Sequence, residues 1–251
     1  MWSFDLIADS AADALRARDA ALREEHAVYG LDAQNELHFH PLIAAGLSAA
    51  GFGVLREQPF PHEWHRKLRA DKKNTTVALP LPRDRQRCDL VLTPEPDQTL
   101  DDSLKTEKQR REDVARHEGS LFALLPTSDL PLPTSAIPPE AAFYLELKLC
   151  GQYTNTSGVP GPNRTYTSDL TRAPLADLKK LAEDHRIMHA GAMLIVFTDG
   201  EQVARHDIGV LTHRILDRDW PISSPTLRSF PIPDRMGNNT CTICLIGMRK
   251  P

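Results

Sequence analysis

The stretch FYLELKLCGQ, residues 143–152, indicates how the fold is built. In an extended strand, successive side chains point to opposite faces of the sheet. The face that carries Glu146 and Lys148 also carries Tyr144 and Cys150. The other face is wholly apolar and suits packing against a helix; it consists of Phe143, Leu145, Leu147 and Leu149. The stretch therefore predicts a core strand that places a carboxylate and an ammonium group together on one face.

A second apolar run, RCDLVL at residues 87–92, predicts a strand with Asp89 on one face and Cys88, Leu90 and Leu92 on the other. If this strand lies beside the first, Asp89 and Glu146 converge. Two close carboxylates repel each other, and a hard divalent cation such as Mg²⁺ relieves that repulsion. The alternative is a solvent-facing strand that carries a glutamate and a lysine without a site.

The segments around these strands predict a mixed α/β layer. The order of elements indicates helices that cover a central sheet. Helices are expected over residues 9–27, 32–51, 174–186 and 203–219, the last of them interrupted at Gly209. Strands are expected over 53–60, 87–92, 143–150, 192–198, 228–234 and 240–247, with an edge segment at 77–82 and a loop over 153–172.

The first core helix is expected to begin near Asp32, or later because Pro41 is awkward inside a helix. Its buried face is expected to consist of Leu37, Leu42, Ile43 and Leu47. In the helix over 174–186, Pro174 fits the first turn, and the inner face is expected to consist of Leu175, Leu178 and Leu181.

The composition changes between residues 93 and 140, where a strongly charged run is followed by a proline-rich one. We interpret 93–140 as an insertion into a single domain that spans 1–251. Residues 1–31 then form an N-terminal helical extension, and residues 201–251 form a C-terminal helix and strands. The insertion is also a candidate for binding a protein partner.

The bulk properties limit the partners of the chain. The formal net charge is −4, which argues against a protein that coats nucleic acid without specificity. An enzyme with basic groups gathered around its cleft remains compatible with this charge, and the basic stretch 65–73 could flank such a cleft. The chain has no apolar run of membrane length and no secretory signal, so we expect a cytoplasmic protein without a membrane partner.

The pattern of Asp89 followed by Glu146-Leu147-Lys148 resembles the D…ExK signature of the PD-(D/E)XK nuclease superfamily. Cys88 stands where the nominal motif has proline. The resemblance covers roughly residues 32–200, including a glutamate, Glu36, on the expected first core helix. It implies a restriction-endonuclease-like fold, in which a mixed central sheet is flanked by helices.

The resemblance also implies a function and a set of roles. Asp89 and Glu146 would bind Mg²⁺ or Mn²⁺, and Lys148 would orient or activate the attacking water, or accept its proton if the pKa of the lysine is lowered. Glu36 would bind the ion through water or hold a second ion. The implied activity is that of a nuclease, such as an endonuclease, with DNA as the expected substrate, and many family members act as homodimers.

Further polar residues after the ExK motif are weaker candidates. Gln152 follows the strand, where some family members have a polar site residue; the alternative is an ordinary loop residue. Arg164, Arg172 and Lys179 are candidates for phosphate contacts. A solvated surface explains the lysine equally well.

Histidines and cysteines suggest two other metal sites. His38 and His40 lie near Glu36, and His40 is one helical turn away from it, but a packed or surface histidine is the favoured interpretation. Cys241 and Cys244 have the spacing of a zinc pair, yet in the expected strand they point to opposite faces and are interpreted as buried thiols.

The alternative to an enzyme is a binding or scaffold module that retains the PD-(D/E)XK fold without cleaving, since a fold does not fix a function. The mild acidity of the chain favours such a module, whereas the intact set of carboxylates and lysine disfavours it.

Overall fold

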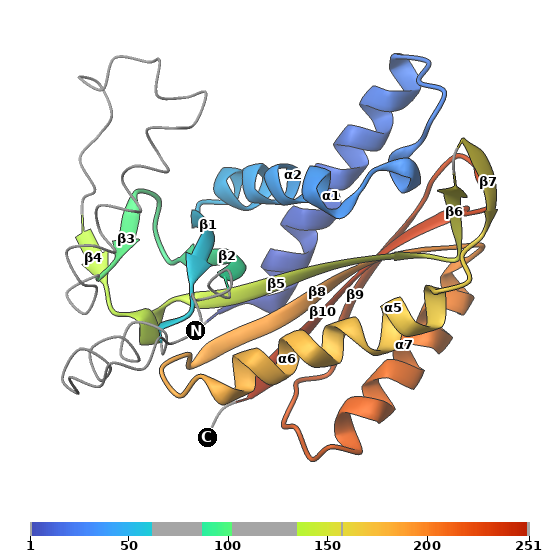
Figure 1. Cartoon of the computed structure of the whole chain (residues 1–251). Helices are drawn as coiled ribbons and strands as arrows, with labels where there is room; N and C mark the ends of the chain where they lie inside the picture. The colour runs from blue at the N-terminus through green and yellow to red at the C-terminus, as the bar shows by residue number, and fades with distance from the viewer. Residues whose placement is uncertain (1, 62–86, 102–134, 157, 250–251) are drawn as a thin grey trace, which may run out of the picture.

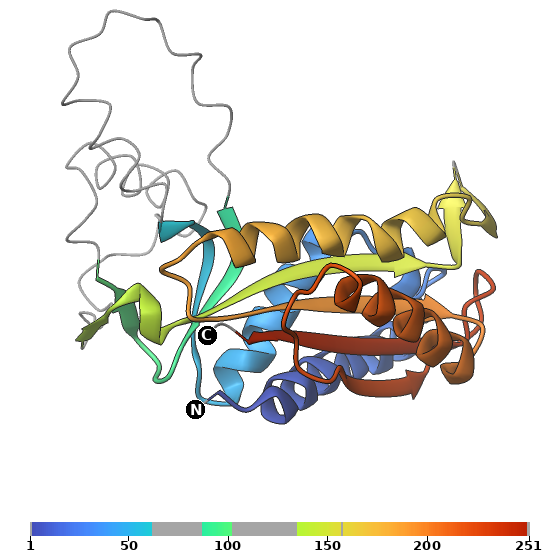
Figure 2. The same ribbon diagram turned by 90° about the horizontal axis from the view of Figure 1, so that it is seen from below.

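The centre of the protein is a six-stranded mixed sheet with helices on both faces (Figures 1 and 2). The computed structural model describes residues 2–61, 87–101, 135–156 and 158–249. In spatial order the strands are β1 (Gly53–Pro59), β2 (Arg87–Thr93), β5 (Phe143–Gly151), β8 (His189–Thr198), β10 (Thr240–Arg249) and β9 (Thr226–Pro231). Strands β5 and β8 are parallel, and the other neighbouring pairs of this sheet are antiparallel. The predicted mixed α/β layer is confirmed.

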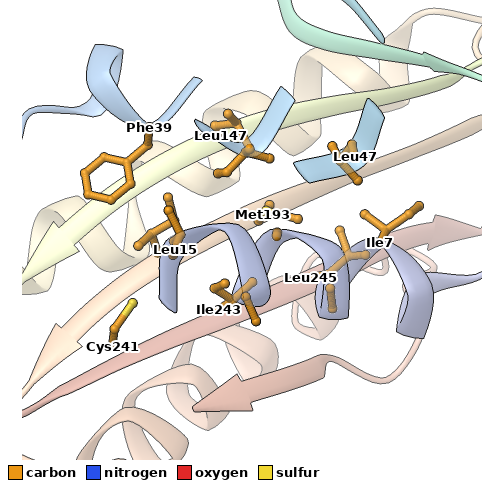
Figure 3. Packing of buried hydrophobic residues seen from close by; sticks show 14 of the residues in the cluster. Ile7, Leu15, Phe39, Leu47, Leu147, Met193, Cys241, Ile243 and Leu245 are labelled. Atoms are coloured by element: carbon orange, nitrogen blue, oxygen red, sulfur yellow. The ribbon is translucent and has the colours of Figure 1, made fainter. Parts of the chain in front are cut away.

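Two helices, α1 (Phe4–Glu24) and α2 (Glu36–Ala49), cover one face, with the short helix η1 (Leu31–Ala33) between them (Figure 1). The apolar stripe of α1 is fully buried and includes Ile7 and Leu15. Figure 3 shows these side chains, with Phe39 of α2, over the leucine face of β5 and the neighbouring strands. The N-terminal helical segment is therefore part of the core.

The opposite face is covered by α5 (Tyr166–Thr171), α6 (Ala173–Glu183) and α7 (Glu201–Leu216), as the view in Figure 2 shows. Pro174 lies in the first turn of α6, where its missing N–H costs nothing. The predicted inner face of this helix is confirmed, because Leu175, Leu178 and Leu181 are all buried.

The predicted parity of β5 is also confirmed. Leu145 and Leu147 belong to the cluster under α1 and α2, whereas Tyr144 and Cys150 belong to the cluster under α5, α6 and α7. Strand β2 departs from its prediction: Leu90 lies on the α1–α2 side, but Cys88 lies on the other side. Side chains two residues apart in a regular strand share a face, so the regular alternation of side chains is interrupted between Cys88 and Leu90.

The two cysteines of β10 are buried on opposite faces of the sheet, as expected. Cys241 belongs to the cluster under α1 and α2, and Cys244 belongs to the cluster under α5, α6 and α7. A single ion cannot be shared by both thiols across a strand. The zinc alternative therefore has no geometry to support it at this pair.

Helix α2 begins at Glu36, later than an Asp32 cap suggests, because Asn35 caps it by accepting a hydrogen bond from the amide of His38 at 3.2 Å. The prediction that Leu37 belongs to the buried face is wrong, since 71% of its surface is exposed. Phe39 is buried instead. Two residues along a helix turn the side chain by about 200°, so these two positions cannot share one face.

Two further expectations are corrected. The expected loop over 153–172 contains the hairpin β6 (Tyr153–Thr156) and β7 (Val159–Pro162), followed by α5. Gly158 forms the turn with a φ of 86°, a conformation that suits glycine. Helix α7 runs through Gly209 without interruption, because the buried side chains of Ile208 and Leu211 hold it against the sheet.

The ends of the expected insertion 93–140 are ordered. Thr93 still belongs to β2, and β3 (Gln98–Leu100) pairs in parallel with β4 (Ser135–Ile137), before the short helix η4 (Pro139–Ala141). The edge segment 77–82, the basic stretch 65–73 and the interior of the insertion, 102–134, lie outside the described residues. Within the described ranges, no helix has both the length and the apolarity needed to cross a membrane.

Candidate functional site

Among the described residues, no strand pairs with the edge of β5 where the two predicted motifs meet. Strand β2 pairs with β5 only from Leu92 opposite Phe143 to Leu90 opposite Leu145. Beyond that point, side chains take over the role of a neighbouring strand. The Oδ2 atom of Asp89 accepts a hydrogen bond from the amide of Leu147 at 2.8 Å.

Glu36 continues the same pattern from α2. Its Oε2 atom accepts a hydrogen bond from the amide of Leu149 at 3.1 Å, and its Oε1 atom lies 3.2 Å from the Nζ atom of Lys148. The predicted convergence of Asp89, Glu36 and the ExK strand is therefore present. We call the group of Glu36, Asp89, Glu146, Lys148 and Asp177 the β5-edge site.

Lys148 is surrounded by oxygen atoms. Besides Glu36, its Nζ atom lies 3.3 Å from Oδ2 of Asp177, and it donates a hydrogen bond to the carbonyl of Leu147 at 2.8 Å. Burial lowers the pKa of Lys148, but the carboxylates of Asp177, Glu36 and Asp89 outweigh it and raise the pKa to about 12. Lys148 is therefore a stable cation, and the lowered pKa required for a proton-accepting role is not found.

Glu146 is an acid in a nearly dry position, with 3% of its surface exposed. Burial raises its pKa, and the nearby charges of Asp89 and Asp177 raise it further, to about 9. Its Oε1 atom has no hydrogen-bond partner in the part of the chain that the structure describes. At neutral pH Glu146 thus retains its proton, and a cation bound by its carboxyl group would replace that proton.

Asp177 on α6 was not predicted as a site residue. It is buried on the opposite side of Lys148 from α2, and its Oδ1 atom lies 2.6 Å from the Nζ atom of Lys180. The sequence did hold a signal for it. Asp177 falls three residues after Pro174 and four before Leu181, which places a carboxylate on the buried stripe of the helix.

A second acidic group lies beside Asp89. His40 of α2 is 2% exposed, and its Nδ1 atom lies 3.9 Å from Oε1 of Glu57 on β1. His40, Glu57 and Asp89 each offer one ligand atom within 4.8 Å of the others. Glu57 was not predicted, because its position opposite Asp89 depends on the register of β1 and β2.

Gln152 lies away from this edge, at the carboxyl end of β5. Its backbone amide donates a hydrogen bond to the backbone carbonyl of Phe197 at 2.9 Å. Its side-chain Oε1 atom accepts a hydrogen bond from the backbone amide of Asp199 at 2.9 Å. It lines an open pocket of about 340 Å³ together with Tyr153 and Tyr166. These contacts join the ends of β5 and β8, so the interpretation as a structural loop residue is the better supported one.

The three candidates for phosphate contacts are Arg164, Arg172 and Lys179, and all are exposed. Lys179 lies 3.7 Å from Glu183, one turn further along α6. Such an exposed pair contributes little to stability. These basic groups are therefore accessible to a ligand, but they are not held in position as Lys148 is.

Comparisons of the chain with protein-family models, with curated proteins and with solved structures found no match.

The chemistry of the β5-edge site follows from its charges. The ammonium group of Lys148 interacts with the carboxylates of Glu36, Asp177 and Asp89. The charges of Asp89 and Asp177 also act on the buried carboxyl group of Glu146. Oxygen ligands fit a hard divalent cation, and one of them, the buried Oε1 atom of Glu146, has no hydrogen-bond partner among the described residues.

Proposed function

We propose that the chain is a metal-dependent nuclease that hydrolyses phosphodiester bonds of nucleic acid, with DNA as the expected substrate and a restriction-endonuclease-like sheet as its scaffold. One observation carries the proposal. At the edge of β5, the Asp89 and Glu146 carboxyl groups meet beside the fixed ammonium group of Lys148. Two acids and a cation in this arrangement suit water attack on a phosphate ester.

Mg²⁺ or Mn²⁺ held by Asp89 and Glu146 would neutralise the two carboxylates and polarise a bound water. The hydrogen bond from the Leu147 amide fixes the orientation of Asp89, and burial fixes Glu146. The side chains are therefore positioned before substrate arrives, so that little reorganisation is needed during the reaction.

Lys148 supplies the positive charge. Because its pKa is raised to about 12, it acts by orienting the attacking water and by stabilising negative charge that develops on the phosphate. Glu36 and Asp177 hold it from two sides. Both oxygen atoms of Glu36 are engaged, with Lys148 and with the Leu149 amide, so we assign this residue to positioning Lys148.

The second candidate function is a module that binds nucleic acid or a protein without cleaving. One observation favours it: the ammonium group of Lys148 is already occupied by two carboxylates and by the Leu147 carbonyl. Binding of Mg²⁺ or Mn²⁺ without any cleavage would support the module over the nuclease.

Cleavage of supercoiled plasmid and of end-labelled DNA and RNA, with Mg²⁺, Mn²⁺ or EDTA, tests the proposal. We expect metal-dependent cleavage by the wild type and a loss of about 100-fold or more in Asp89→Asn and Lys148→Met. The Asp89→Asn change retains a side-chain oxygen that can accept the Leu147 amide, so the fold should survive it. Lys179→Met removes an exposed ammonium group and is the matched control; full activity in Lys148→Met would overturn the mechanism.

A further inference from the structure

In the part of the chain that the structure describes, one buried imidazole has no hydrogen bonds. His40 is almost completely enclosed, yet neither Nδ1 nor Nε2 has a hydrogen-bond partner among the residues that the structure describes. Burying a polar group without a partner is costly, and each such group in a folded protein requires an explanation. One explanation is a ligand that is bound by the ring when the protein is at work.

Two carboxylates face this imidazole from the strands packed against α2. Glu57 comes from β1 and Asp89 from β2, and the three ligand atoms lie within 4.8 Å of one another. Glu57 interrupts the pairing of its strand, since Arg56 pairs with Leu90 and Gln58 pairs with Cys88 around it. The three residues thus come from three elements and converge on one point.

The spacing is close to that of a metal site. In tetrahedral coordination at about 2.0 to 2.2 Å, neighbouring ligand atoms lie about 3.4 Å apart. The Nδ1 atom of His40 and the Oε1 atom of Glu57 are 3.9 Å apart. The Glu57 side chain is half exposed, so it is free to make the small movement that closes this gap.

We propose that His40, Glu57 and Asp89 form a binding site for a divalent transition-metal ion such as Zn²⁺ or Mn²⁺. An imidazole ligand suits transition metals and disfavours Mg²⁺ and Ca²⁺, which prefer oxygen. Three protein ligands leave a coordination position for water or for a substrate oxygen. Asp89 is shared with the β5-edge site, whereas His40 and Glu57 belong to the new site alone.

Metal binding at His40, Glu57 and Asp89 is separate from the proposed nuclease activity and does not depend on cleavage. A chain that binds a transition metal at His40 without cutting DNA would retain this site and lose the proposed function. Conversely, a nuclease that uses Asp89 and Glu146 alone would retain its function and lose this site.

Titration of the full chain with Co²⁺, followed by visible absorption, reports nitrogen and oxygen coordination directly. Competition with Zn²⁺ then gives its affinity for the same site. We expect Co²⁺ affinity to fall at least about tenfold in His40→Leu and in Glu57→Gln. His38→Gln, an exposed histidine on the same helix, is the matched control and should bind as the wild type does.

Glu146→Gln and Lys148→Met separate the two proposals, because both should lose cleavage and retain the Co²⁺ spectrum. Unchanged Co²⁺ affinity in Glu57→Gln would overturn the inference, even if His40→Leu fails to fold, because Glu57 lies at the surface. The absence of a Co²⁺ spectrum in the wild type would overturn it as well.

Discussion

The side chain of Glu146 is an ionisable group buried away from water. Its pKa is raised to about 9, first by burial and then by the charges of Asp89 and Asp177. An acid with a raised pKa in the folded state favours folding in its protonated form. The stability that the protonated acid contributes is therefore fully present below the ordinary pKa near 4.5, and it is lost as the pH rises from there towards 9.

This gives a pH-dependent prediction for Glu146→Gln. Glutamine has the shape of the protonated acid and no charge, so in EDTA the variant should be more stable than the wild type above about pH 5. The gain should grow with pH and reach on the order of a few kcal/mol near pH 9. Urea unfolding at pH 6, 7.5 and 9 measures it, with Glu183→Gln on the exposed face of α6 as control. A difference that stays constant with pH would contradict the assigned environment.

At the level of the elements, the edge of β5 is completed by side chains in place of a strand. Asp89 binds the amide of Leu147, and Glu36 binds the amide of Leu149. Each carboxylate therefore supports the sheet as well as the site. Removing one of them should loosen the strand locally, because a buried donor without an acceptor is costly.

Glu36→Ala tests this arrangement. We expect the free energy of unfolding to fall by about 1 to 3 kcal/mol and hydrogen exchange at the Leu149 amide to accelerate. The Leu147 amide still donates its hydrogen bond to Asp89, so its exchange rate, measured in the same experiment, is the internal control. Equal acceleration at both amides would mean that the variant loosens the whole strand, and no acceleration at Leu149 would mean that the hydrogen bond contributes nothing.

Much of this region could be predicted from local patterns. The two-residue period of residues 143–150 predicts both faces of β5. The neighbouring strand β2 brings Asp89 to this strand, although the alternation of β2 is interrupted at Asp89. Glu36 was placed correctly on the first core helix. These predictions succeed because strand parity and helix periodicity are properties of the chain itself.

The missed features depend on contacts between distant segments. Glu57 faces Asp89 because of the pairing register of β1 and β2, and this register cannot be predicted from the sequence of either strand. Leu37 lies on the exposed face because it is turned by about 200° from the buried Phe39. Gly209 does not interrupt α7 because tertiary packing outweighs its low helix propensity. Asp177 is the exception, because the helical period of residues 174–181 alone places it on the buried stripe of α6.

On the scale of the whole molecule, α1 is expected to unfold together with the sheet. Leu15 is fully buried in the cluster that α1 shares with α2 and the strands, whereas 45% of Leu6 on the same helix is exposed. Leu15→Ala should lower the free energy of unfolding by about 2 to 5 kcal/mol, since it removes apolar contacts and leaves a cavity. Leu6→Ala is the control, with an expected change of about 0.5 kcal/mol or less.

Urea unfolding followed by circular dichroism and by tryptophan fluorescence measures both variants. Trp2 lies beside Phe143 of β5, with ring centroids 5.7 Å apart, so its share of the fluorescence reports on the junction of α1 with the sheet. Trp64 and Trp220 contribute the rest of the signal. Coincident transitions in both signals are expected. A Leu15→Ala variant as stable as Leu6→Ala would mean that α1 is not part of the cooperative core.

The central claim is that a divalent ion at Asp89 and Glu146, beside Lys148, makes the edge of β5 a catalytic site. Crystals soaked in Mn²⁺ test it most directly, through the anomalous difference map. We expect a peak in contact with carboxyl oxygens of both Asp89 and Glu146 in the wild type, and its loss in Asp89→Asn. A fully occupied Mn²⁺ peak elsewhere, with none in contact with Glu146, would show that this pair of carboxyl groups does not hold the ion.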